Sequence, residues 1–155
     1  MKTIVVGIGN SQFADDGIGL LVAQNIKSKD LGPETMVIDT STYGLDILEL
    51  IAGFDKAIII DAVQTGQNEP GFIYRFDINQ VQSPLRIFPH GMDFITSLKL
   101  GEKLGLEVPN EIIVFGIEVQ NVGDLTEECT PRVRAALPFC VENIMHELNT
   151  STVSN

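Results

Sequence analysis

The sequence has 155 residues, of which 44% are hydrophobic and 20% charged, so the chain can bury one core and lacks the composition of a disordered protein. Asp and Glu number 21 against 10 Lys and Arg, and the resulting net charge of -11 argues against binding to nucleic acid. No apolar run reaches the roughly 20 residues that span a bilayer, and the first apolar segment is too short for a signal peptide. We therefore expect a cytoplasmic monomer that binds neither nucleic acid nor membranes, with Cys129 and Cys140 as reduced packing residues.

Apolar segments alternate with helical patterns along most of the chain, which is typical of an α/β fold with a mainly parallel sheet. The first strand is predicted over residues 3–8, and a glycine-rich turn and an amphipathic helix over residues 18–26 follow it. A second strand is predicted over residues 36–38 and a second helix over residues 45–51. The repeated order of strand, loop and helix predicts neighbouring parallel strands.

The middle of the chain supplies the clearest buried strand, over residues 56–60, which ends on the carboxylate of Asp61. A turn-rich connection without a helix leads to a strand over residues 72–76, which we predict as an antiparallel edge hairpin because a parallel crossover needs a covering helix. An irregular segment then leads to a helix over residues 90–105, and a further strand is predicted over residues 111–119.

The chain is predicted to close with a helix that begins at Pro131, a residue suited to the first helical turn, and that is kinked at Pro138. No internal repeat or linker divides the sequence. We therefore predict a single α/β domain over residues 1–148, followed by a polar tail over residues 149–155 that frays.

Three features of the sequence are candidates for chemistry: the acidic glycine-rich loop that carries Asp15 and Asp16, the strand-ending Asp61, and His90. The carboxyl ends of parallel strands face one edge of a sheet, where ligands bind near the point at which the strand order reverses. If the first and third strands are neighbours, Asp16 and Asp61 meet there, and the long loop can bring His90 over them. Two carboxylates and an imidazole form a three-ligand metal site with positions open for water or substrate.

Each of these residues also has a structural explanation. Asp15 and Asp16 can cap the following helix, Asp61 can accept hydrogen bonds from loop amides, and His90 can be an ordinary residue at a helix start. Asn10 is interpreted as a turn former. Two further acids have two interpretations each: Asp93 belongs to an early helical turn or orients His90, and Glu118 is a partly buried strand-end acid or a surface residue.

A dinucleotide site is the main rival, because Gly7 and Gly9 follow the first strand and Asp39 ends the second, where a ribose-binding acid would lie. Gln12 replaces the third glycine of that motif, and the acidic pair of the loop would repel a pyrophosphate. The sequence also lacks a phosphate-binding Gly-Lys-Ser/Thr motif, a zinc-protease helix at His146 and a Gly-x-Ser-x-Gly motif. A hydrolase of this sequence would have no recognisable covalent nucleophile.

Six short motifs follow one another with a specific order and spacing: Val5-Val-Gly-Ile-Gly-Asn10, Asp15-Asp-Gly-Ile-Gly19, Thr42-Tyr-Gly-Leu45, Ile60-Asp-Ala62, Pro89-His-Gly91 and Phe115-Gly-Ile-Glu118. In this order they resemble the endopeptidases that mature the large subunit of nickel–iron hydrogenases. The resemblance spans nearly the whole chain, and one mild difference is Ser41, where relatives often carry Gly.

The resemblance implies a three-layer α/β fold with a mainly parallel five-stranded sheet. It implies that Asp16, Asp61 and His90 stand at the metal-contacting positions. The surrounding loops that support them contain Gly7, Gly9, Asn10, Asp15, Gly44 and Asp93.

The implied activity is removal of a short C-terminal extension from a hydrogenase large-subunit precursor after nickel insertion. The nickel would be carried by the substrate's cysteines, so no permanently bound cofactor is expected. The attacking water could be activated either by a metal ion or by a carboxylate general base, and the sequence does not decide between them. Two alternatives of other classes are a non-catalytic metal or nucleotide-binding module and a maturation scaffold that holds the precursor without cutting it.

Overall fold

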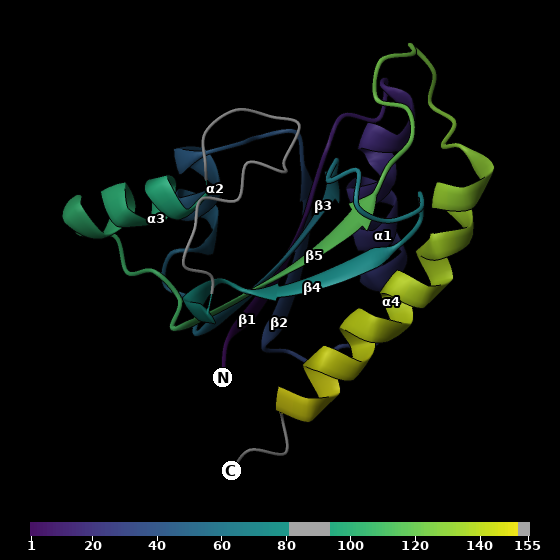
Figure 1. The fold of residues 1–155 in the computed structure, drawn as a ribbon. Coiled ribbons are helices and arrows are strands. Elements are labelled where there is room, and N and C mark those ends of the chain that lie inside the picture. The colour runs from purple at the N-terminus through teal and green to yellow at the C-terminus, as the bar shows by residue number, and fades with distance from the viewer. Residues whose placement is uncertain (81–93, 152–155) are drawn as a thin grey trace.

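The structure is a computed structural model that describes residues 1–80 and 94–151. In this described part the strands form one five-stranded sheet in the order β2-β1-β3-β5-β4 (Figure 1). The strands are β1 (Thr3–Ile8), β2 (Thr35–Thr40), β3 (Lys56–Val63), β4 (Ile73–Asp77) and β5 (Glu111–Glu118). β1, β2, β3 and β5 run parallel, whereas β4 pairs antiparallel with β5 at the sheet edge.

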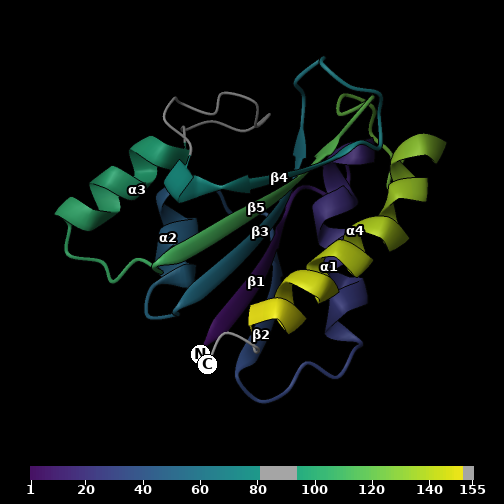
Figure 2. The same cartoon turned by 60° about the horizontal axis from the view of Figure 1, so that its bottom comes forward.

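Helices cover both faces of the sheet, so the predicted three-layer α/β fold is confirmed. The helices are α1 (Ile18–Lys27), α2 (Leu45–Ile51), α3 (Phe94–Lys103) and α4 (Pro131–Ser151). α1 and α4 lie on one face, and α2 and α3 lie on the other (Figures 1 and 2). Two short 3₁₀ helices, η1 (Ala14–Gly17) and η2 (Ile78–Gln80), follow β1 and β4.

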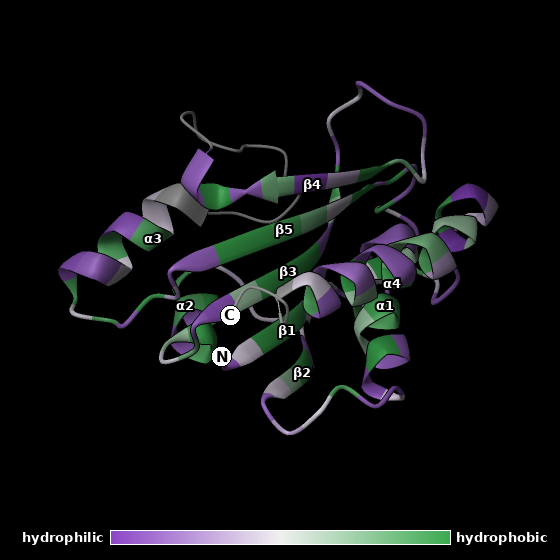
Figure 3. Cartoon of the chain, turned by 90° about the horizontal axis from the view of Figure 1, so that it is seen from below, coloured by the Kyte–Doolittle hydropathy of each residue, from purple (hydrophilic) through white to green (hydrophobic). Residues whose placement is uncertain are grey.

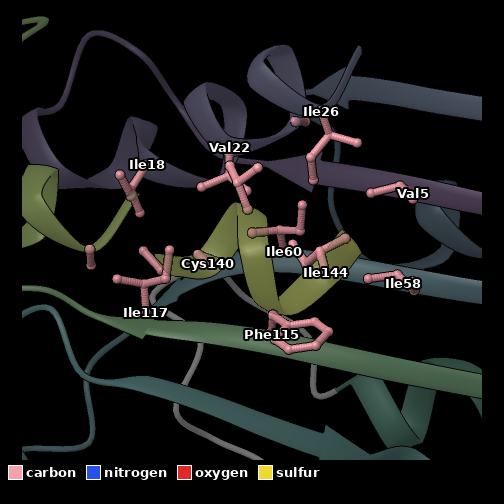
Figure 4. Packing of buried hydrophobic residues seen from close by; sticks show 14 of the residues in the cluster. Val5, Ile18, Val22, Ile26, Ile58, Ile60, Phe115, Ile117, Cys140 and Ile144 are labelled. Carbon is pink, nitrogen blue, oxygen red and sulfur yellow. The ribbon is translucent and has the colours of Figure 1, made fainter. Parts of the chain in front are cut away.

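The strands at the centre of the sheet are apolar on both sides because each side is covered by helices (Figure 3). All residues of β1 and β3 are buried, whereas the edge strand β4 is only half-buried. On the face covered by α1 and α4, Val22 and Ile26 pack toward Ile60 and Ile144 (Figure 4). Cys129 and Cys140 are free and buried in the same cluster, as expected for packing residues.

Three details differ from the sequence-based expectations. β3 continues to Val63 through pairing with β5, so Asp61 lies inside the strand and not after it. The segment expected to form a hairpin pairs with β5, not with β3, because β5 takes the position beside β3. α4 ends at Ser151, so the last helix enters the segment expected to be a polar tail.

The predicted helix start at residue 90 lies outside the described residues, and the described part of that helix begins at Phe94. Pro138 lies inside α4 as predicted. Among the helices of the described residues, none is long and apolar enough to cross a membrane.

Close contact between α1 and the sheet depends on two glycines. A Cβ on Gly19 would lie 2.4 Å from the carbonyl oxygen of Ile8 and 2.7 Å from that of Ile60. A Cβ on Gly7 would lie 2.3 Å from the carbonyl oxygen of Gly19. These obstacles are backbone atoms that a side-chain rotation cannot move, so only glycine lets α1 lie this close to β1 and β3.

We expect Gly19→Ala to lower the free energy of unfolding by about 3 kcal/mol, the cost of overpacking a close-packed interface. Gly123→Ala is the matched control, because a Cβ there has no neighbour within 4 Å. Urea unfolding of both variants measures the difference. Equal stability of the two variants would contradict the packing that we describe between α1 and the sheet.

Candidate functional site

Two of the predicted site residues, Asp16 and Asp61, lie at the carboxyl ends of neighbouring strands. Asp16 belongs to η1, directly after the loop that ends β1, and Asp61 lies near the end of β3, which pairs with β1. The side chains are buried, with 0% exposure for Asp16 and 3% for Asp61. The structure thus brings these two carboxylates to one edge of the sheet, as the rule for parallel strands predicts.

Burial and the nearby Asp16 disfavour ionisation of the Asp61 carboxyl group. Burial raises the pKa of Asp61 well above its ordinary value, and the negative charge of Asp16 raises that pKa further. The amide of Ala62 donates a hydrogen bond of 2.8 Å to Asp61 Oδ1, which offsets part of the effect. Asp16 accepts a hydrogen bond of 3.0 Å at Oδ2 from the amide of Asn10. A cation at this position would relieve the repulsion.

Tyr43 lies close enough to these acids to be affected by both. Its phenol pKa is raised by burial first, and then by the negative charges of Asp16 and Asp61. Tyr43 precedes α2 in the loop after β2, so it comes to the site from a third parallel strand. It was not among the predicted site residues; its place in the Thr42-Tyr-Gly-Leu45 motif was the signal that could have found it.

Asp15 has a different role from its neighbour. Its carboxylate accepts hydrogen bonds from the amides of Gln120 and Asn121, both at 3.0 Å, from the amide of Thr130 at 2.6 Å and from the Thr130 hydroxyl at 2.9 Å. All these donors belong to the loop between β5 and α4. Neither η1 nor α1 has a side-chain cap, so the interpretation of Asp15 as a helix cap is wrong and it anchors this loop instead.

We expect Asp15→Ala to destabilise the protein by about 3 kcal/mol, because several amides lose a charged acceptor at once. The loop that Asp15 anchors should also exchange its amide hydrogens faster. Hydrogen exchange of residues 120–130, together with urea unfolding, tests both effects. Unchanged protection of those amides would show that the loop is held by other contacts.

The loop residues predicted to support the site have identifiable roles. A Cβ on Gly9 would lie 2.1 Å from the carbonyl oxygen of Asp16, so glycine permits the close approach of this backbone. Asn10 forms a turn in which its Oδ1 accepts a hydrogen bond of 3.0 Å from the amide of Gln12, which confirms its interpretation as a turn former. Gly44 adopts a φ of 66° directly before α2, a conformation that favours glycine.

His90 and Asp93 lie outside the described residues, so the third predicted metal-contacting position stays a prediction. Within residues 1–80 and 94–151, no group of three His, Cys, Asp or Glu side chains has the arrangement of a metal site. The described residues therefore contribute two carboxylates to the predicted three-ligand set.

Two further acids that the sequence singled out, Asp39 and Glu118, are held by ordinary contacts. Asp39 forms an ion pair of 2.6 Å with Lys27 and accepts a hydrogen bond of 3.1 Å from Gln24, and these bonds lower its pKa. This engagement leaves the dinucleotide alternative without support from Asp39. Glu118 is a buried strand-end acid: burial alone would raise its pKa, but hydrogen bonds from Thr65 and Tyr74 outweigh burial and lower it.

The two cysteines are not candidates for a nucleophile. Burial raises the pKa of the Cys140 thiol to about 12 and also raises the pKa of Cys129. Since the thiolate is the reactive form, both side chains stay protonated and unreactive near neutral pH.

A family model described as hydrogenase maturation protease matches residues 20–147 of this chain. The chain belongs to this family. The hydrogenase 2 maturation protease of Escherichia coli (strain K12) is 25% identical over 156 residues, which cover 99% of this chain and 94% of that protein. The predicted family resemblance is confirmed, and the protein is a peptidase.

Solved structures of the family share the fold of this maturation protease. The structure of the hydrogenase maturating endopeptidase HybD from E. coli has a TM-score of 0.79 and 24% identity, covering 97% of this chain and 94% of that one. The [NiFe] hydrogenase maturation protease HybD from Thermococcus kodakarensis has a TM-score of 0.70 and 26% identity, covering 96% of this chain and 99% of that one.

Proposed function

We propose that this maturation protease acts in the cytoplasm as a monomer and removes the C-terminal extension of a nickel–iron hydrogenase large-subunit precursor after nickel insertion. Asp16, Asp61 and His90 contact the nickel that the precursor carries, and this contact places the scissile peptide. The observation that carries the proposal is the buried pair of carboxyl groups, Asp16 and Asp61, at the carboxyl ends of β1 and the neighbouring β3.

A buried carboxylate pair is costly to a folded protein unless a cation or a proton offsets its charge. A divalent metal presented by a substrate supplies that charge only when the correct substrate is bound. Carboxylates and an imidazole are weaker ligands for nickel than cysteine thiolates, so the protease can contact the metal without removing it from the precursor. Under this proposal nickel is part of the substrate, and the protease needs no permanently bound cofactor.

The names of the relatives support the choice of substrate class. The T. kodakarensis relative is a [NiFe] hydrogenase maturation protease, and it is covered over 99% of its length. The E. coli relative is named for the maturation of hydrogenase 2. Because this chain covers nearly the whole length of both relatives, the proposal is based on the activity of the complete proteins.

Intact mass spectrometry of a nickel-loaded precursor, incubated with catalytic amounts of the protease, tests the activity. The expected result is a smaller large subunit and a released peptide whose masses sum to the precursor plus one water. A stable one-to-one complex without any product would contradict the proposal and favour the maturation scaffold.

A further inference from the structure

We propose that the polar cleft beside Asp16 binds an extended peptide segment of the precursor next to the scissile bond. The inference rests on the proposed function and adds a subsite to it. The cleft has a volume of about 370 Å³ and lies between residues 9–12, after β1, and residues 39–41, at the end of β2, with Leu20 of α1 contributing to its lining.

The cleft shares a wall with the candidate metal site. Asn10 lines the cleft, and its amide donates the 3.0 Å hydrogen bond to Asp16 Oδ2. Gly9 also lines it and is the residue against which the Asp16 carbonyl lies. A chain segment in the cleft would therefore contact the loop that donates a hydrogen bond to the carboxylate proposed to contact the nickel.

The chemistry of the lining matches a polypeptide backbone. Ser11 and Ser41 supply hydroxyl groups from opposite walls, and Asn10 and Gln12 supply amides. These groups can pair with the N–H and C=O that each residue of an extended peptide presents. The volume lies near the lower end of the range for ligand pockets, roughly 300–1,000 Å³, which suits a short peptide segment.

Charged ligands fit the cleft poorly. Among the residues that the structure describes, the lining contains no Lys, Arg or His to pair with the phosphates of a nucleotide. Asp39, the acid among the described lining residues, is engaged by Lys27 and Gln24. The neutral hydrogen-bonding surface that is left favours main-chain recognition over recognition of a charged group.

Filling the cleft from either wall tests the proposal. Ser41→Trp and Ser11→Tyr each place a bulky side chain at an exposed residue of the lining. Ser28→Trp, at the end of α1, is the matched control because Ser28 is exposed and does not line the cleft. Steady-state cleavage of the nickel-loaded precursor gives KM and kcat separately, and thermal unfolding reports whether each variant is folded.

We expect both cleft variants to raise KM at least about 10-fold with kcat within about 3-fold of wild type, the pattern of lost substrate binding, and the control to match wild type. A KM unchanged in the folded cleft variants, or a loss confined to kcat, would overturn the subsite. If one variant fails to fold, the other, from the opposite wall, decides. Absence of cleavage by the wild-type protein would instead overturn the proposed function.

A binding experiment checks the same subsite without turnover. Intact mass spectrometry of the products identifies the cleavage site. A synthetic peptide that spans this site should shift the amide NMR signals of residues 9–12 and 39–41, and a scrambled peptide should not. Shifts that avoid these residues, or equal shifts with both peptides, would also overturn the subsite.

Discussion

Asp61→Asn is expected to reduce precursor processing at least about 100-fold while leaving the fold as stable as wild type or more stable. The amide keeps an oxygen that can accept the hydrogen bond from Ala62, so the local structure is retained. It removes a buried ionisable group whose charged form is disfavoured by burial and by Asp16. A gain in stability together with a loss of activity is the expected signature of a functional carboxylate pair.

Processing rates and thermal unfolding midpoints, measured on the same preparations, test this expectation. Asp16→Asn and His90→Ala should lose processing in the same way. Glu142→Gln, an equivalent acid-to-amide change at an exposed position of α4, is the control and should behave as wild type. Full processing by Asp16→Asn and Asp61→Asn would refute the assignment of the site, and a large loss of stability would make both acids structural.

Glu147→Gln is expected to lower the free energy of unfolding by about 3 kcal/mol, because it removes the charge that faces a buried ammonium group. Lys56, whose side chain is 2% exposed, lies 2.8 Å from Glu147 and 3.2 Å from Glu111. Arg75 donates two hydrogen bonds to the same Glu147 carboxylate, at 2.9 and 3.0 Å. This cluster joins α4 to β3 and β4. Lys56→Met should cost less, because Glu147 then keeps Arg75.

The effect of Glu147→Gln should depend on pH. Hydrogen bonding from Arg75, followed by that from Lys56, lowers the pKa of Glu147 below its ordinary value of 4.5. The carboxylate therefore stabilises the folded state fully above pH 4.5, and this contribution is lost as the pH falls through the lower pKa of the folded protein. Urea unfolding of wild type, Glu147→Gln and Glu142→Gln between pH 3 and pH 7 measures it. A difference from wild type that is constant over this range would contradict the ion-pair explanation.

The fold was largely predictable because its signals are local. Continuous apolar segments identified β1, β3 and β5, and helical periodicity identified α1 and α2. The partner of β4 was not predictable from its short connection to β3, since strand order depends on which strand is covered on both faces. The Lys56–Glu147 pair joins residues 91 positions apart, and no local pattern shows such a contact.

The candidate site was predictable in part for the same reason. Asp16 follows β1 and Asp61 lies near the end of the neighbouring parallel strand β3, so the sheet geometry brings the two residues together. The role of Asp15 as an anchor of the 120–130 loop was not visible, because the path of that loop depends on distant parts of the chain. Tyr43 was missed because a tyrosine before a helix has many ordinary explanations.

If the protease recognises the metal that its substrate carries, one precursor should be cleaved with nickel and not without it. Intact mass spectrometry should show loss of the C-terminal peptide from the nickel-loaded precursor, none from the nickel-free precursor, and none from either with Asp61→Asn. Equal cleavage of the loaded and nickel-free precursors would contradict the account, because Asp16 and Asp61 would then have no metal to recognise.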